Sequence, residues 1–158
     1  MLTSPAQFSL RSPEATGQAA ARLAPQLVPG DVILLSGSVG AGKTHFARHL
    51  IQSVLDVPDD IPSPTFTLVQ TYDTSIGPVW HSDLYRISST FEIEELGLSE
   101  AFDTAICLIE WPDRLGDLRP ASALELTFED GPDDDARILT AIWTAGHWSD
   151  RLTEWAWL

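Results

Sequence analysis

Gly37-Ser38-Val39-Gly40-Ala41-Gly42-Lys43-Thr44 is the stretch that decides the fold of this chain. It fits the pattern G-x-x-x-x-G-K-[ST] of a nucleotide phosphate-binding loop. Glycines in such a loop let backbone N–H groups turn toward phosphate oxygens, in conformations closed to residues that carry a Cβ. The following helix adds the unpaired N–H groups and the positive dipole end of its N-terminus. In this pattern the lysine reaches the β- and γ-phosphates, and the threonine hydroxyl binds Mg²⁺.

The residues on either side of the loop predict the strand and the helix that the loop needs. Residues 32–35 form a continuous apolar run, which is typical of a buried parallel strand. After the loop, apolar residues recur at helical spacing from Phe46 to Leu55. Lys43 is the only lysine of the chain, and the other eight basic residues are arginines. A slim ammonium fits along the phosphates better than a planar guanidinium, so this choice of residue also favours a phosphate site.

Length and composition predict one soluble domain over residues 1–158. The chain is 44% hydrophobic and 20% charged, and no apolar stretch approaches the roughly 20 residues of a membrane helix. Cys107 is the sole cysteine, which excludes an internal disulfide and predicts a cytoplasmic protein. The net charge of −14 indicates a surface that repels nucleic acid, so a partner would have to hold any nucleic acid.

Apolar spacing and turn residues predict the remaining elements. They are a helix over residues 12–27, a hairpin over 67–85, short helices near 90–97 and 99–102, a buried strand over 105–110, a hairpin over 124–143, and a helical tail after 147. In the tail, Trp148, Leu152 and Trp155 recur at helical spacing, so we expect them to face the core.

Two acidic residues are candidates for the catalytic chemistry. Hydrolysis needs an acid near Mg²⁺, usually at the end of an apolar strand next to the phosphate loop. Glu110 follows the apolar run 106–109 and is the first candidate, and Asp83 ends the other predicted strand and is the second. Each also fits an ordinary strand-end carboxylate facing water, since acids are mostly exposed. The phosphate loop in the same chain favours the catalytic interpretation.

The segment Ser63-Pro64-Thr65-Phe66 lies between the nucleotide helix and the strand that ends at Asp83. In nucleotide switches a loop at this position offers a hydroxyl, here that of Thr65, to Mg²⁺ or the γ-phosphate. Taken alone, the pattern favours an ordinary proline turn that enters a strand. His45 and His49 have the spacing of metal ligands, but no glutamate general base lies between them, and we expect no transition-metal site there.

Five motifs in a fixed order carry a family resemblance. They are Gly40-Ala41-Gly42-Lys43-Thr44, Ser63-Pro64-Thr65-Phe66, His81-Ser82-Asp83-Leu84-Tyr85-Arg86, Glu94-Glu95-Leu96-Gly97 and Glu110-Trp111-Pro112. In order and spacing they resemble the TsaE (YjeE) family, small bacterial ATPases needed for tRNA threonylcarbamoyladenosine biosynthesis. The motifs span roughly residues 34–112, and the resemblance extends over the whole chain by length.

The resemblance implies a fold, a mechanism and partners. The fold is α/β, a P-loop NTPase with a mixed, mostly parallel sheet, helices on both faces and inserted antiparallel hairpins. Thr44 and Glu110 coordinate the Mg²⁺ of bound ATP, Asp83 acts in hydrolysis, the segment 63–66 is a switch-like loop, and Trp111 supports the site. The partners are TsaB and TsaD, whose complex ATP hydrolysis resets, and tRNA is reached only indirectly through TsaD.

The loop departs from the family pattern at two places. Ser38-Val39 stands where the family usually has an acid followed by leucine, which alters the outer contacts of the loop. His45 stands where the family usually has a second hydroxyl, and a histidine can still donate a hydrogen bond to the α-phosphate. We therefore count residues 37–45 and Trp111 as the candidate nucleotide-binding residues.

Three other classes of protein share a phosphate loop. A small GTPase is excluded, because its Asn-Lys-x-Asp motif needs a lysine outside the loop. A small-molecule kinase usually carries an arginine-rich lid, whereas Arg86, Arg114 and Arg119 are scattered. A nucleotide-gated binding module without significant hydrolysis stays open, since the sequence does not separate it from a slow ATPase.

Overall fold

A seven-stranded sheet forms the centre of the computed structural model, which describes residues 2–38, 40–57, 61 and 68–157. Its order is β1-β7-β6-β2-β5-β4-β3. The strands are β1 (Ala6–Leu10), β2 (Val32–Gly37), β3 (Val69–Thr74), β4 (Gly77–Asp83), β5 (Ile106–Glu110), β6 (Leu124–Asp130) and β7 (Arg137–Ile142).

The sheet is mixed, as the sequence predicts. The central strands β6, β2, β5 and β4 are joined by parallel pairings, and β7 and β3 flank them as antiparallel partners. At one edge β1 pairs antiparallel with β7. Among the described strands, only β3 and β7 therefore run against the other five. The α/β class and the two inserted hairpins, β3–β4 and β6–β7, are confirmed.

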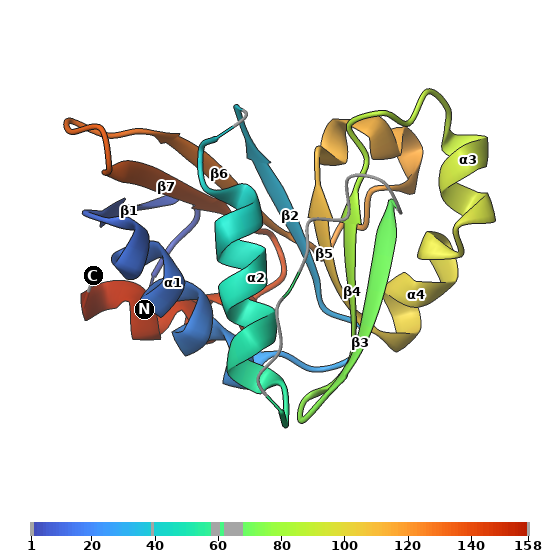
Figure 1. Cartoon of the computed structure of the whole chain (residues 1–158), viewed down its shortest axis with the longest axis horizontal. Coiled ribbons are helices and arrows are strands. Elements are labelled where there is room, and N and C mark those ends of the chain that lie inside the picture. Colours follow the sequence, from blue (N-terminus) through green and yellow to red (C-terminus); the bar gives the residue numbers. More distant parts are fainter. Residues whose placement is uncertain (1, 39, 58–60, 62–67, 158) are drawn as a thin grey trace.

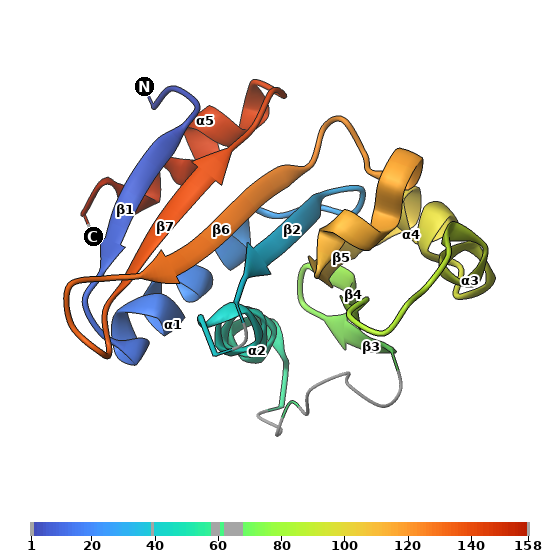
Figure 2. The same ribbon diagram turned by 90° about the horizontal axis from the view of Figure 1, so that it is seen from above.

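Helices cover both faces of the sheet (Figures 1 and 2). They are α1 (Pro13–Leu23), α2 (Lys43–Val54), α3 (Thr90–Glu95), α4 (Leu98–Thr104) and α5 (His147–Arg151), with 3₁₀ turns η1 (Ala24–Gln26), η2 (Pro112–Leu118) and η3 (Leu152–Trp157). Alternation along β2 divides the core, since side chains of a strand point to opposite faces in turn. Ile33 and Leu35 pack with α1, α2, α5 and η3, whereas Val32 and Leu34 pack with α3, α4 and η2.

The first helix begins as predicted and ends earlier. Ser12 is extended at the N-cap, and its hydroxyl accepts a hydrogen bond from the Ala15 amide at 3.1 Å. The predicted helix over 12–27 is α-helical only to Leu23 and then tightens into the 3₁₀ turn η1. Pro25 explains the change, because a proline has no N–H to donate to the preceding turn.

Two elements were not predicted from the sequence. The edge strand β1 places Phe8 and Leu10 in the core, and its hydrogen bonds all run to β7, more than 120 residues later. The 3₁₀ turn η2 begins at Pro112, at the point where the chain leaves the sheet. No helix of the described residues has the length and apolar character needed to cross a membrane.

The tail packs against the first helix, which confirms the core-facing prediction for Trp148, Leu152 and Trp155. The indole N–H of Trp155 donates to the Ala19 carbonyl at 2.8 Å. The Trp155 ring meets Phe8 and Phe46 edge to face, with ring centroids 5.3 and 6.1 Å apart. The last residues therefore join β1, α1 and α2 into one apolar cluster.

The parallel centre of the sheet positions the site. In a parallel sheet the carboxyl ends of neighbouring strands meet at one edge, where ligands bind in open α/β folds. The register places Leu35 of β2 opposite Glu110 of β5, and Glu110 opposite Asp83 of β4. The phosphate loop that follows β2 therefore lies beside both acidic candidates.

We expect Trp155→Ala to lower the free energy of unfolding by about 3–5 kcal/mol, the usual range for deleting a buried aromatic ring. Trp155→Phe keeps most of the ring and loses the bond to Ala19, so its loss should be smaller. Urea denaturation measures both changes. Phe91→Ala is the control, because that ring is 68% exposed and its removal should change stability by less than about 0.5 kcal/mol. Equal losses at Trp155 and Phe91 would contradict the packing of the tail.

Candidate nucleotide-binding site

The phosphate loop connects the end of β2 to the start of α2, and its glycines are required by the backbone. Gly37 has φ of +141°, and a Cβ there would lie 2.6 Å from the Phe128 carbonyl oxygen of β6. Gly42 has φ of +111° at the N-cap of α2. Side chains are disfavoured in both conformations, so the first and last glycines of the motif let the chain turn from the sheet into the helix.

The Lys43 side chain is held inside the loop. It is 5% exposed, and its ammonium donates to the carbonyl oxygens of Gly37 and Ser38. Nζ also lies 4.0 Å from the centroid of the Trp111 ring, a cation–π contact. Burial lowers the pKa of Lys43, and the negative charges of Glu110 and Asp83 act in the opposite direction. The buried ammonium thus has two carbonyl partners and one aromatic partner.

A buried chain of hydrogen bonds joins α2 to the two strand ends. The Thr44 hydroxyl donates to Oε1 of Glu110 at 2.6 Å, and His81 Nε2 lies 2.7 Å from Oε2. Because a carboxylate accepts hydrogen bonds, His81 is the donor. Glu110 is 2% exposed and His81 fully buried. Both oxygens of Glu110 are therefore oriented by side chains from other elements.

The donor set at this point suits Mg²⁺, which prefers oxygen ligands and keeps several waters or phosphate oxygens. The predicted pair, Thr44 and Glu110, supplies one hydroxyl and one carboxylate at hydrogen-bond distance. Among the described residues, no three His, Cys, Asp or Glu side chains lie close enough together to hold a metal ion by themselves. Together with phosphate oxygens, a hydroxyl and a single carboxylate are the usual protein contribution to a nucleotide-bound Mg²⁺.

Asp83 lies at the end of β4, in register with Glu110. Its Oδ1 accepts a hydrogen bond from the Tyr85 amide at 3.0 Å. Burial raises the pKa of Asp83, and the neighbouring charge of Glu110 adds to this, while the Tyr85 hydrogen bond opposes it. A carboxylate with a raised pKa is the stronger proton acceptor, which suits a general base.

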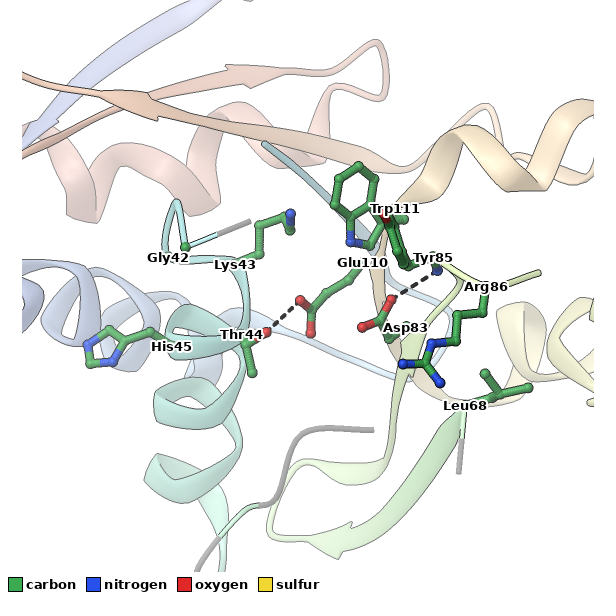
Figure 3. A pocket seen from close by; sticks show the side chains of 11 residues that line it. Gly42, Lys43, Thr44, His45, Leu68, Asp83, Tyr85, Arg86, Glu110 and Trp111 are labelled. Carbon is green, nitrogen blue, oxygen red and sulfur yellow. Dashed lines mark hydrogen bonds between the residues drawn. The ribbon is translucent and has the colours of Figure 1, made fainter. Parts of the chain in front are cut away.

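These residues surround a cavity of about 470 Å³, within the usual size range of small-molecule sites. Figure 3 shows Lys43 and Trp111 on one side of it, Asp83 and Glu110 between them and Arg86, and His45 directed away. The lining residues are Gly40, Gly42, Lys43, Thr44, His45, Leu68, Asp83, Tyr85, Arg86, Glu110 and Trp111.

Most predicted site residues come together here. Gly37, Ser38 and Ala41 belong to the loop but do not line the cavity. His45 borders the cavity with its ring turned away, since Nε2 donates to the Pro13 carbonyl at 2.8 Å and the ring packs at a tilt against His49. The predictions for Val39, Thr65 and the segment 63–66 lie outside the described residues.

Several site residues were not assigned a role from the sequence. His81 could have been found, because it lies two residues before Asp83 on the same face of β4. Tyr85 packs against Trp111 with the rings tilted and their centroids 4.8 Å apart. Leu68 and Trp111 have positive φ values of 64° and 59°, which are uncommon for residues other than glycine. No sequence pattern predicts these two backbone conformations.

Comparison with known proteins identifies the family of this chain. The family model described as "Threonylcarbamoyl adenosine biosynthesis protein TsaE" matches residues 10–139. Two relatives are named tRNA threonylcarbamoyladenosine biosynthesis protein TsaE. That of Rickettsia felis is 42% identical over 76% of this chain and 70% of its own length. That of Bacillus subtilis is 35% identical over 83% of this chain and 82% of its own length.

A solved structure also matches the fold. The crystal structure of YdiB from Bacillus subtilis superposes with a TM-score of 0.80 and 26% sequence identity. The match covers 99% of this chain and 97% of YdiB. The family model extends well beyond the five motifs, through β6 and into β7. The resemblance inferred from those motifs is confirmed: the chain belongs to the TsaE family.

Proposed function

We propose that this protein is a Mg²⁺-dependent ATPase that acts in N6-threonylcarbamoyladenosine modification of tRNA. One observation carries the proposal. Thr44, the residue after the phosphate-loop lysine, is hydrogen-bonded to the buried strand-end carboxylate of Glu110. This is the arrangement that holds Mg²⁺ beside nucleotide phosphates in P-loop proteins. Membership of a family named for threonylcarbamoyladenosine biosynthesis supports the pathway.

Each residue of the site has a separate part in the proposed reaction. Lys43 and the loop N–H groups bind the β- and γ-phosphates, and Thr44 and Glu110 hold Mg²⁺. Bound Mg²⁺ would neutralise charge that develops on the phosphates. Asp83 orients the attacking water and accepts its proton, a role that its raised pKa favours. Trp111 covers the Lys43 side of the cavity.

The proposed partners are TsaB and TsaD, with tRNA held by TsaD. A chain of net charge −14 whose only lysine lies in the phosphate loop is a poor ligand for a polyanion. We therefore place the protein in the cytoplasm as the ATP-driven component of a complex, where hydrolysis resets TsaB–TsaD between rounds of modification. The nucleotide-gated module without hydrolysis is the alternative that turnover measurements distinguish.

Lys43→Ala should weaken ATP binding by on the order of tenfold to a hundredfold, because it removes a charged hydrogen-bond donor from the phosphates. Lys43→Arg should also fail, since the planar guanidinium does not fit a space shaped for an ammonium. Calorimetric titration gives the affinities, and phosphate release with and without TsaB–TsaD gives the turnover. Wild-type affinity and turnover in Lys43→Ala would contradict the assignment of the loop. Normal binding with no turnover by the wild-type protein in either assay would favour the nucleotide-gated module.

The two acids should separate in their effects. Glu110→Gln removes the charge but keeps the shape, so the Mg²⁺ concentration for half-maximal activity should rise at least about tenfold. Asp83→Asn should lower turnover on the order of a hundredfold with a smaller effect on ATP affinity, as expected for loss of a general base. A Mg²⁺ titration of phosphate release measures both. The reverse pattern would show that the two roles are exchanged.

The isolated protein should form no appreciable complex with tRNA in filter binding at about 0.15 M salt, the physiological ionic strength. Its affinity for TsaB–TsaD should differ between ATP and ADP. The γ-phosphate offers contacts that ADP lacks, and a ligand that binds one conformation better shifts the protein toward that conformation. Tight, salt-sensitive tRNA binding by the protein alone would contradict the proposal. Partner binding that is indifferent to the nucleotide would contradict the resetting role.

A further inference from the structure

Arg137 connects the distant C-terminal half of the chain to the phosphate loop. Its Nε donates to the Ala41 carbonyl at 3.2 Å, and its Nη2 lies 3.3 Å from the Gly40 carbonyl. The two acceptors are consecutive carbonyls of the loop, 96 and 97 residues earlier in the chain. A guanidinium presents its N–H groups as a rigid planar fork, so one side chain can engage both carbonyls together.

The hairpin β6–β7 holds this guanidinium in place. Arg137 is the first residue of β7, where its backbone is in register with Leu10 of β1 and Asp130 of β6. Its Nη1 donates to the carbonyls of Asp134 and Ala136, each at 2.7 Å. The Arg137 guanidinium is therefore oriented by the sheet and by the hairpin turn, independently of its contacts with the phosphate loop.

These contacts determine how the loop peptides are turned. In a peptide plane the C=O and the N–H point in opposite directions. Because the Gly40 and Ala41 carbonyls point toward Arg137, the N–H groups of Ala41 and Gly42 point away from it. The Ala41 N–H closes a turn on the Ser38 carbonyl at 3.1 Å. Arg137 thus contacts both peptide planes that flank Ala41. It adds to the Ser38 turn at the first plane, and at the second it restrains the peptide next to Gly42, a residue type with wide backbone freedom.

We propose that Arg137 is a positioning residue of the phosphate loop, and that it presets the loop backbone for the nucleotide phosphates. This inference rests on the proposed function, because it assumes that the loop binds nucleotide. A glycine-rich loop that must be ordered on binding loses affinity to conformational entropy, and ordering it beforehand recovers that affinity. Three aspartates, Asp133, Asp134 and Asp135, precede the arginine closely. Long-range attraction by Arg137 is therefore weak, and its effect comes from directed hydrogen bonds.

Two substitutions separate the hydrogen-bonding fork from the charge. Arg137→Gln removes the charge and the planar fork, whereas Arg137→Lys keeps the charge but offers a single donor head. Both should weaken ADP and ATP binding by about tenfold, on the order expected for hydrogen bonds from a charged donor. The KM for ATP should rise more than kcat falls. A loop that is preset for phosphate helps the ground state and the transition state equally, and loss of such uniform binding raises KM. Arg119→Gln is the matched control, since that arginine pairs with Glu125 and not with the loop.

Calorimetric titration with ADP and with ATP, together with thermal denaturation of each variant, tests the proposal. Wild-type affinity in Arg137→Gln, or full recovery of affinity in Arg137→Lys, would overturn it. A lower melting temperature with unchanged nucleotide affinity would show a structural role only and would also overturn it. Lys43→Ala separates the two levels of inference. If Lys43→Ala loses binding while Arg137→Gln does not, the positioning role alone is wrong; if Lys43→Ala binds normally, the proposed function fails as well.

Discussion

The hydrogen bond between Thr44 and Glu110 is the constraint on which the rest of the structure depends. It joins the first turn of α2 to the end of β5, and it forms only if β2 and β5 are parallel neighbours in the observed register. A buried carboxylate is costly unless its oxygens are hydrogen-bonded, and here Thr44 and His81 satisfy one oxygen each. His81 comes from β4, so the same carboxylate also requires the third parallel strand. The central sheet therefore holds together, through one side chain, the groups that the site needs.

The arrangement also explains why the peripheral elements are present. The two central parallel strands, β2 and β5, are buried on both faces and need helices on each side, which α1 and α2 supply on one face and α3 and α4 on the other. The hairpin β6–β7 extends the sheet beyond β2 and carries Arg137 to the phosphate loop. The C-terminal tail covers the face of the sheet on which α1 and α2 pack, through Trp148 and Trp155. Elements far from the motifs in sequence thus support the loop backbone as well as the core.

Local patterns predicted much of the fold because the responsible interactions are local. The loop, β2 and α2 follow from a motif flanked by apolar spacing, and both hairpins follow from alternation around turn residues. The strand β1 could not be predicted, since its pairing with β7 depends on residues at the other end of the chain. The contact of Arg137 with Ala41 could not be predicted either, because the two residues are 96 positions apart in the chain. The sequence placed Asp83 and Glu110 at strand ends, but the register that sets them side by side is a property of the assembled sheet.

Electrostatic screening determines the distance over which the charges of this protein act on a phosphate ligand. The chain carries a net charge of −14, so its distant field opposes any polyanion. At physiological ionic strength this field is screened beyond about 8 Å. Within that distance the hydrogen-bond donors and charges of the site determine whether an anion binds. Lys43, the α2 N-terminus and the proposed Mg²⁺ are concentrated within one cavity, where a nucleotide with its metal carries less net charge than a nucleic acid. A short phosphate chain fits within this range, whereas a tRNA backbone extends far beyond it and meets the net negative charge of the whole chain. The same charge distribution therefore favours a nucleotide in the loop and supports leaving the tRNA to a partner protein.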